Sequence, residues 1–264
     1  CWYYLRYLDS FNKEAMAAGA KEKYWMPVDI YIGGVEHAVL HLLYARFWHK
    51  VLFDIGAVST KEPFQKLVNQ GLILGPDGQK MSKSKGNVIN PDAITKDFGA
   101  DSLRLYEMFM GPLEDAKPWK PEGIIGPYRF LGRVWKLMTD PKLRNKSEST
   151  NKAFVDLDEK FAALNRLLHK TIKKVGADIE NFHFNTAISA LMILFNELEK
   201  QKDQLSIVNC QLFLKLLFPF APHLAQELWE QFGNSGLLDK EPWPQYEEAL
   251  TLESEIELLI QVNG

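Results

Sequence analysis

The hydrophobic positions in the first part of the chain follow the pattern of strands that alternate with helices. Residues 28–32 form a short apolar run rich in branched side chains, which predicts a buried strand, and Gly33 and Gly34 predict a tight turn after it. Apolar residues then recur at intervals of three or four over 35–47, which predicts a helix. Residues 67–74 predict a second buried strand. The first part is therefore expected to be an α/β region.

From about residue 126 the strand patterns stop and helical periodicity replaces them. Helical patterns cover residues 126–139, 153–175, 184–202, 205–218 and 222–232. The polar segment 140–151 is expected to be a loop between the first two. Amphipathic helices with short connections predict a bundle. The expected fold class is α/β followed by all-α, with domains at 1–125 and 126–250 and the start of a third at 251–264.

The two ends of the chain suggest that it was cut from a longer protein. Trp2, Tyr3 and Tyr4 form an aromatic run at the very start, and such residues are expected in a core. At the other end, residues 256–262 predict a strand, and the hairpin signal Asn263-Gly264 is followed by no return strand. Both termini are therefore expected to continue in the parent protein.

Composition narrows the class of protein without identifying it. The 264 residues are 46% hydrophobic and 25% charged, which is typical of globular domains. Cys1 and Cys210 are the two cysteines and lie far apart, which favours a reducing compartment over a disulfide framework. No apolar run approaches the roughly 20 residues that span a bilayer. A cytoplasmic protein that does not enter a membrane is expected.

Charge is unevenly distributed along the chain. Residues 1–150 carry 21 Lys and Arg against 17 Asp and Glu, whereas residues 151–264 carry 10 against 17. A mildly basic first half can bind phosphates, but taken alone the small excess of charge favours an ordinary solvated surface.

A lysine-rich loop is the first candidate for chemistry. Residues 80–87 read Lys-Met-Ser-Lys-Ser-Lys-Gly-Asn and stand just before a helix that Asn90 caps and Pro91 opens. Ammonium, hydroxyl and backbone N–H groups on a flexible loop can stabilise charge on a leaving polyphosphate. By composition alone, an exposed basic loop is the favoured interpretation.

The turn after the first strand is the second candidate. Ligands of open α/β sheets bind beyond the carboxyl ends of the strands, which is where Gly33, Gly34, Glu36 and His37 are expected. A carboxylate there can accept hydrogen bonds from ribose hydroxyls. His37 and His41 also have the spacing of zinc proteases, but Glu36 precedes the first histidine instead of following it, so no metal site is predicted.

The order of residues in both segments resembles one family. The run Lys80-Met81-Ser82-Lys83-Ser84 with its flank to residue 89 resembles the signature loop of class I aminoacyl-tRNA synthetases, and residues 28–46 resemble the matching segment of bacterial leucyl-tRNA synthetases. The resemblance implies a partial Rossmann-like catalytic domain that binds ATP with its Mg²⁺ ion. It implies ATP-binding roles for the following residues: Gly33, Gly34, Glu36, Lys80, Met81, Ser82, Lys83 and Ser84. Lys80 and Lys83 would be catalytic through phosphate stabilisation.

The resemblance extends over most of the chain. Tyr3, which by its chemistry alone is a core residue, and His37 match positions that border the leucine side chain. Residues 98–105 resemble the helix that follows the signature loop, and residues 184–192 and 218–229 resemble the helical anticodon-binding-type domain, which implies tRNA(Leu) as a partner. One predicted helix is basic, and its basic residues either contact RNA phosphates or form a solvated face: Lys160, Arg166, Lys170, Lys173 and Lys174.

Parts of the family pattern are missing. The sequence lacks the N-terminal half of the nucleotide fold with its His-x-Gly-His element, the editing domain, and most of the C-terminal domain. The resemblance therefore implies a fragment or subunit of a leucine–tRNA ligase that is inactive alone and needs the missing half, from the same chain or a separate subunit. The alternative is a free-standing tRNA-binding or accessory module without activation chemistry.

Overall fold

The computed structural model describes residues 2–144, 159–202 and 205–252. By internal contacts the chain divides into two compact units, which are described separately here. Unit 1 comprises Cys1–Met81 and Leu113–Trp119, and unit 2 comprises Ser82–Pro112 and Lys120–Gly264. The predicted strand at 256–262 and the predicted loop beyond residue 144 lie outside the described residues.

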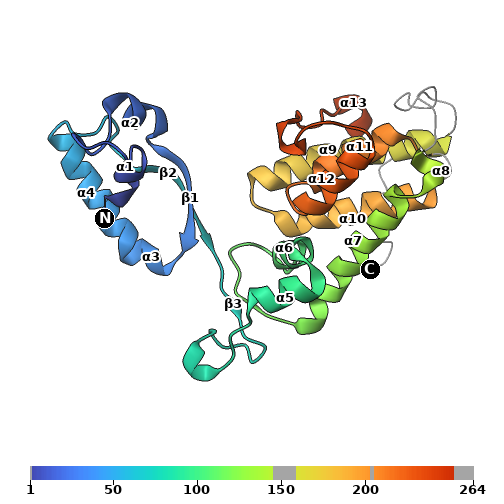
Figure 1. Cartoon of the computed structure of the whole chain (residues 1–264), viewed down its shortest axis with the longest axis horizontal. Coiled ribbons are helices and arrows are strands. Elements are labelled where there is room, and N and C mark those ends of the chain that lie inside the picture. The colour runs from blue at the N-terminus through green and yellow to red at the C-terminus, as the bar shows by residue number, and fades with distance from the viewer. Residues whose placement is uncertain (1, 145–158, 203–204, 253–264) are drawn as a thin grey trace, which may run out of the picture. The chain divides into compact units, whose positions relative to one another are not determined.

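Unit 1 is built around a strand–helix–strand crossover (Figure 1). Strand β1 (Val28–Gly34) pairs in parallel with β2 (Phe64–Gln70), in a register from Val28 opposite Phe64 to Gly34 opposite Gln70. Helices α3 (Glu36–Val39) and α4 (His41–Asp54) connect the two strands. The first strand and the α/β character are confirmed. The strand is not buried as predicted, because Ile30 and Ile32 are exposed, and it continues through Gly33 and Gly34, where a tight turn was predicted. The predicted single helix is interrupted at Leu40, whose backbone angles are not helical (φ −102°, ψ −91°).

The second predicted strand is corrected by the structure. Residues 67–74 form the end of β2 and, after a break, the short strand β3 (Ile73–Leu74), which pairs in parallel with β4 (Lys117–Pro118). At the break, the Gly71 N–H donates to the carbonyl of Leu113 at 2.8 Å. The backbones approach so closely that a Cβ at position 71 would overlap with the carbonyl of Asp115. The chain therefore changes pairing partners inside one apolar run, which periodicity cannot reveal.

A small core holds the N-terminal helices of unit 1, α1 (Tyr3–Tyr7) and α2 (Gly19–Trp25). Tyr4 donates its hydroxyl to Nδ1 of the fully buried His49 at 2.9 Å, and His49 Nε2 lies 2.8 Å from the carbonyl of Thr60. Burial lowers the pKa of His49, so the neutral ring donates from Nε2 and accepts at Nδ1. Of the aromatic run expected in the core, Tyr4 is buried, but Trp2 is 48% exposed and Tyr3 41% exposed.

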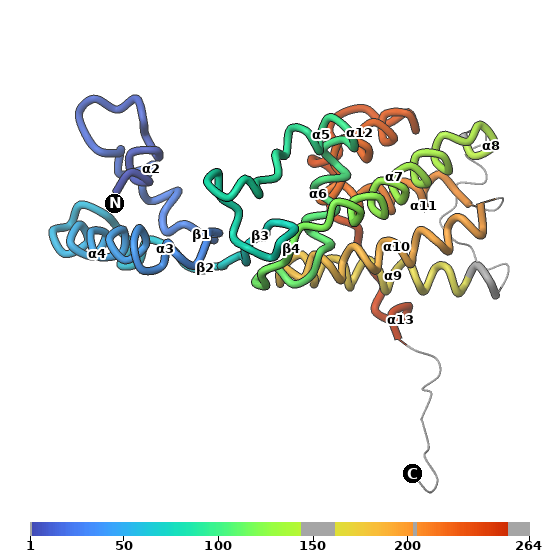
Figure 2. Tube along the Cα trace, turned by 90° about the horizontal axis from the view of Figure 1, so that it is seen from below, coloured from blue at the N-terminus to red at the C-terminus, as the bar shows by residue number. Residues whose placement is uncertain are grey.

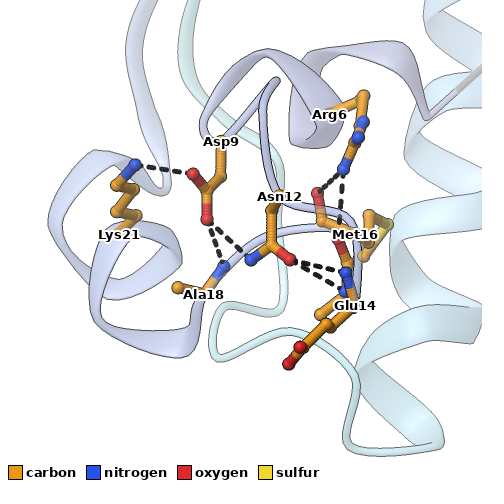
Figure 3. A network of polar contacts seen from close by, with 8 residues as sticks. Arg6, Asp9, Asn12, Glu14, Met16, Ala18 and Lys21 are labelled. Carbon is orange, nitrogen blue, oxygen red and sulfur yellow. Dashed lines mark hydrogen bonds and ion pairs between the residues drawn. The ribbon is translucent and has the colours of Figure 1, made fainter.

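A polar network closes the loop between α1 and α2 (Figure 3). The Asp9 carboxylate accepts from the ammonium of Lys21 at 2.6 Å, the amide of Asn12 at 2.9 Å and the backbone N–H of Ala18 at 3.0 Å. Hydrogen bonds from Lys21 and Asn12 lower the pKa of Asp9 to about 2. Arg6 donates to the carbonyl of Ala15 at 3.1 Å on the other side of the loop. The loop is thus held by polar contacts in place of an apolar core.

Unit 2 is almost entirely helical. Its described elements are η1 (Lys83–Lys85), α5 (Pro91–Phe98), α6 (Ala100–Phe109), η2 (Pro121–Ile124), α7 (Ile125–Met138), α8 (Pro141–Arg144), α9 (Glu159–Glu180), α10 (Phe184–Lys200), α11 (Ile207–Leu217), α12 (Pro222–Gln231), η4 (Leu238–Lys240) and α13 (Glu248–Thr251). The helical bundle is confirmed. Each predicted helix is found in the described part, although α8 occupies the start of the segment expected to be a loop.

The bundle core fills the space between the long helices. Figure 2 shows α9 and α10 side by side, and the largest fully buried side chains include Phe195, Phe213 and Phe220. Phe195 stacks edge-on against Phe130 of α7, with ring centroids 5.5 Å apart. Pro222 opens α12 as predicted. The buried apolar side chains stabilise the fold by roughly 25 cal/mol per Å² of apolar surface removed from water.

The N-terminus of α12 is capped from another helix. Its own N-cap residue, Ala221, has no side chain that can accept a hydrogen bond. The Asp101 carboxylate on α6 accepts from the backbone N–H groups of Leu224 at 2.7 Å and His223 at 3.4 Å. It also lies 2.7 Å from Nδ1 of His223. The first turns of α6 and α12 are therefore tied together by one carboxylate.

Within the described residues, no helix is long and apolar enough to cross a bilayer. Cys210 is a buried cysteine of the bundle core.

Candidate functional site

Glu36 lies directly against the end of the first strand. Strand β1 ends at Gly34, and α3 begins two residues later at Glu36. The Glu36 carboxylate folds back over the buried Gly34, so that a Cβ at position 34 would overlap with its oxygen atoms. A Cβ at Gly33 would press on the ring of Tyr31 at 3.0 Å. The structure thus brings Gly33 and Gly34, the last two residues of the parallel strand β1, next to Glu36 at the start of α3.

Tyr3 and His37 both lie against His41. The Tyr3 hydroxyl is 3.1 Å from His41 Nε2, and the two ring centroids are 5.2 Å apart. The ring of His37 meets that of His41 edge-on at 6.4 Å. Burial lowers the pKa of His41 and raises that of Tyr3, with Tyr31 also raising it, so both rings are neutral at pH 7. His41 thus contacts both residues that were predicted to border the leucine side chain, a contact that the sequence did not predict.

The lysine-rich loop spans the boundary between the two units. Lys80 and Met81 belong to unit 1, and the residues from Ser82 onward belong to unit 2. Lys80 forms an antiparallel bridge with Leu74 at the end of β3. The N–H of Gly75 donates to the carbonyl of Gln79 at 2.8 Å, which closes the turn before it. The loop is therefore anchored to a strand on its N-terminal side.

Hydroxyl groups shape the second half of this loop. The Ser82 N–H donates to Asn87 Oδ1 at 2.9 Å, and the Ser82 hydroxyl accepts from the N–H of Lys85 at 3.3 Å. The hydroxyls of Ser82 and Ser84 are 3.1 Å apart. Gly86 ends the short helix η1 with φ +67°, a left-handed conformation that a residue with a side chain rarely adopts. The serines and Gly86 therefore fix the local backbone on which the lysines are carried.

Lys83 projects its charge into solvent. Its side chain is exposed, and within the described part of the chain no hydrogen bond or ion pair joins it to another residue. An ammonium group without a counter-ion is available to an anionic ligand at no cost of breaking an existing pair. A helix follows shortly after, because the Asn90 side chain accepts from the Asp92 N–H at 3.0 Å and starts α5.

The basic residues of α9 are partly neutralised by acidic neighbours. Lys173 pairs with Glu248 of α13, and Lys174 pairs with Asp178 at 2.9 Å. Lys160 lies in the helix but its side chain is outside the described residues. Contact between α9 and RNA stays a prediction. The two ion pairs show that Lys173 and Lys174 are partly neutralised by carboxylates, which the sequence alone did not reveal.

No group of three or more His, Cys, Asp or Glu side chains is arranged to hold a metal ion in the described segments.

Comparison with known proteins relates both parts of the chain to one family. Residues 14–118 match the model for class I tRNA synthetases of the isoleucine, leucine, methionine and valine group. Residues 162–264 match the model for the anticodon-binding domain of tRNA ligases.

Solved structures agree with this relationship. A LeuRS from Agrobacterium radiobacter K84, in a ternary complex with tRNA and LeuAMS, is 38% identical over 95% of this chain, with a TM-score of 0.87. The chain spans 32% of that protein. Two structures of Mycobacterium tuberculosis methionyl-tRNA synthetase with methionyl-adenylate are each 16% identical to this chain and share its fold alone. The first has a TM-score of 0.61 and covers 81% of this chain and 46% of its own. The second has a TM-score of 0.62 and covers 86% of this chain and 47% of its own.

Both family models, together with the α/β unit, the lysine-rich loop and the helical bundle, indicate the same family. The chain belongs to the class I aminoacyl-tRNA synthetases, as a leucyl-tRNA synthetase-like segment with a class I catalytic region followed by an anticodon-binding domain.

Proposed function

We propose that this chain supplies the phosphate-binding loop, part of the ribose and leucine sites, and the tRNA-binding helices of a leucine–tRNA ligase. The whole enzyme activates leucine with ATP, whose bound Mg²⁺ arrives with the substrate, and then transfers leucine to tRNA(Leu). It acts in the cytoplasm. The observation that carries the proposal is the loop at Lys80–Ser84: its two serines are bonded within the loop, which leaves the exposed Lys83 ammonium for a polyphosphate.

The chemistry requires charge stabilisation more than proton transfer. The leucine carboxylate attacks the α-phosphate, the bond to the β-phosphate oxygen breaks, and pyrophosphate leaves with the additional charge. Lys80 and Lys83 stabilise that charge, and Ser82 and Ser84 hold the loop in shape. Met81 belongs to the same ATP-binding loop.

The turn after β1 binds the other parts of the substrates. The Glu36 carboxylate, held over Gly34, accepts hydrogen bonds from the ribose hydroxyls of ATP, and Gly33 lets the nucleoside approach the backbone. Tyr3 and His37, on either side of His41, border the leucine side chain. Because His41 is neutral, it places no charge beside the leucine side chain, which is apolar.

An exposed parallel sheet supports the need for the missing half. Parallel sheets are normally covered on both faces, yet in this chain Ile30 and Ile32 of β1 are 45% and 56% exposed and Leu67 of β2 is 46% exposed. In the part of the chain that the structure describes, no further strand pairs with β1 or β2. The N-terminal half of the catalytic domain, as a separate polypeptide or an earlier part of the same chain, is the partner that covers this surface.

Leucine-dependent exchange of pyrophosphate into ATP tests the proposal. The chain alone is expected to give no exchange, because the N-terminal half of the active site is absent. Adding a polypeptide that carries the class I N-terminal half, with its His-x-Gly-His element, is expected to restore exchange with leucine and not with methionine. The same half mixed with a Lys83→Ala chain serves as the matched control, because its complex should assemble without fast activation.

Two results would contradict the proposal in different ways. Exchange by the chain alone would show that the active site is complete without the other half. Tight binding of tRNA(Leu) with no exchange in the assembled mixture would favour the accessory module instead.

A further inference from the structure

The helical unit contains a pocket whose lining includes no residue of the lysine-rich loop. It has a volume of about 350 Å³ and is lined by residues of α6, α7 and α12 together with the end of α5. This volume is within the range of about 300–1,000 Å³ found for small-ligand sites. None of the roles assigned above uses it.

The walls of the pocket are aromatic. Tyr128 and Trp135 of α7 are 50% and 40% exposed, and Phe98 meets Tyr128 edge-on at 5.6 Å. Gly132 lies between the two α7 rings, four residues after one and three before the other, so all three positions share one helix face. A Cβ at Gly132 would meet no atom within 4 Å. The missing side chain therefore opens a slot between two exposed rings.

A hydroxyl group also lines the pocket. Ser102 is only 3% exposed as a residue, and its hydroxyl makes no hydrogen bond to another described residue. The neighbouring Asp101 carboxylate is engaged by the start of α12. The Ser102 oxygen is not one of the fully buried unsatisfied polar atoms, so solvent or a ligand in the pocket can reach it. Ser102 is thus positioned to donate to, or accept from, a polar edge of a ligand.

One basic residue, Arg129, lines the pocket. Its helix, α7, also carries Arg133 and Lys136 and no acidic residue. Arg133 is held by Glu199 at 2.6 Å, but neither the Arg129 nor the Lys136 side chain has a hydrogen bond or ion pair within the described segments. Exposed rings, a buried hydrogen-bonding group and unpaired cations together fit a flat heterocycle attached to a phosphate backbone.

We propose that this pocket binds one unstacked nucleobase of the tRNA. The base stacks on the rings at the Gly132 slot, its polar edge bonds the Ser102 hydroxyl, and Arg129 and Lys136 contact the flanking phosphates. The inference rests on the proposed function, since it requires tRNA(Leu) to be the partner of the bundle.

Filling the slot gives a test that spares the fold. Gly132→Leu places a side chain in the pocket at a helical position with open space above it, and leucine is a better helix former than glycine. Gly126→Leu is the matched control, because Gly126 lies in the same helix, is also exposed with open space above it, and does not line the pocket. Circular dichroism and thermal unfolding verify that both variants fold.

Binding of a tRNA(Leu) transcript is then measured together with the chemical reactivity of its unpaired bases. Because stacking of one base on an aromatic ring is worth a factor of about 5 to 150 in affinity, Gly132→Leu is expected to weaken binding by that factor and Gly126→Leu to leave it unchanged. One unpaired base should be protected by the unmodified chain and by Gly126→Leu, and should become reactive again with Gly132→Leu.

The outcomes separate this inference from the proposed function. If the unmodified chain binds the transcript and Gly132→Leu binds equally well with the same protection, the pocket inference alone is overturned, and a peptide or another protein becomes the better occupant. If the unmodified chain does not bind the transcript, tRNA is not its partner and both proposals are overturned.

Discussion

At the scale of single residues, the chemistry depends on which charges remain unpaired. Lys83 is exposed with no partner in the described part of the chain, whereas Lys173 and Lys174 are paired with carboxylates. A lysine that already has a carboxylate partner must break that ion pair before it binds a phosphate. The free energy lost with the first pair largely cancels the free energy gained from the second. Lys83 therefore offers more to an anionic ligand than Lys173 and Lys174 of α9.

Replacing Lys83 by alanine tests this role. In the assembled ligase, Lys83→Ala is expected to slow leucyl-adenylate formation about 100- to 1,000-fold, which is the effect of losing one preorganised electrostatic donor. The affinity for leucine should hardly change, since the loss affects the transition state. Pre-steady-state adenylate formation measures the rate, and Lys96→Ala, an exposed lysine on α5, is the control. A near-normal rate in Lys83→Ala would refute the role.

The order of residue types in the sequence identified the lysine-rich loop. It did not reveal the contacts around Glu36 and Tyr3. The alternation of lysine and serine at 80–84 is local, so the sequence alone suggested a phosphate loop. The folding of Glu36 back over Gly34 depends on the local backbone path, and the pairing of Tyr3 with His41 joins residues 38 positions apart. The 41% exposure of Tyr3 likewise depends on tertiary neighbours, which is why aromatic character alone predicted a core residue.

At the scale of helices, α12 depends on a cap that its own sequence does not provide. Ala221 occupies the N-cap position, and Asp101 of α6 accepts the N–H groups of the first turn instead. A carboxylate at that end also interacts favourably with the helix dipole. The contact therefore stabilises two helices at once, with Arg104 of α6 adding a 2.9 Å bond to the carbonyl of Pro219.

Substitutions at Asp101 measure this cap. Asp101→Ala is expected to lower the free energy of unfolding of the helical unit by about 1–2 kcal/mol, since the first turn of α12 loses its acceptor. Asp101→Asn should cost less, because its amide oxygen still accepts a hydrogen bond. Urea denaturation followed by circular dichroism compares the two variants. Equal losses in both would mean that charge, and not hydrogen bonding, dominates the contact.

The helices were easier to predict than the strands for a physical reason. The periodicity that defines α7 and α10 is carried by each helix itself, and the structure confirms both. The pairing of β2 and β3 with different partners is set by residues 113–118, more than 40 positions away, which no local pattern encodes. The break between α3 and α4 is likewise a single irregular residue inside an apolar run.

At the scale of the whole molecule, both units contain histidines whose pKa burial lowers. His41 and His49 lie in unit 1, with His49 the fully buried one, and His169, which accepts from the Glu247 N–H at 2.9 Å, lies in unit 2. Because the pKa of these histidines is lower in the folded state, the unfolded chain binds a proton at a higher pH than the folded chain does. The stabilisation is complete above the unfolded pKa of about 6.5 and is lost as the pH falls below it. Asp9 and Glu62, whose pKa values are about 2, stay ionised throughout this range.

Acidification from pH 7 to pH 5.5 is therefore expected to lower the stability of both units. His49→Gln should reduce the pH dependence of one unfolding transition and His169→Gln that of the other. Urea unfolding at both pH values, with each variant, assigns the transitions to the units. A single transition that both variants affect equally would show that the two units unfold as one.

The division of the chain into these units also has a consequence for its synthesis. Unit 1 takes its last segment, Leu113–Trp119, from beyond α5 and α6, so strand β4 reaches its partner β3 only after the 31 residues Ser82–Pro112 of the other unit have been translated. The N-terminal unit thus cannot be completed on the ribosome in simple vectorial order. Its exposed apolar strands β1 and β2 leave the ribosome before the segment Leu113–Trp119 is translated. During this interval the nascent chain most needs a chaperone or the other half of the catalytic domain.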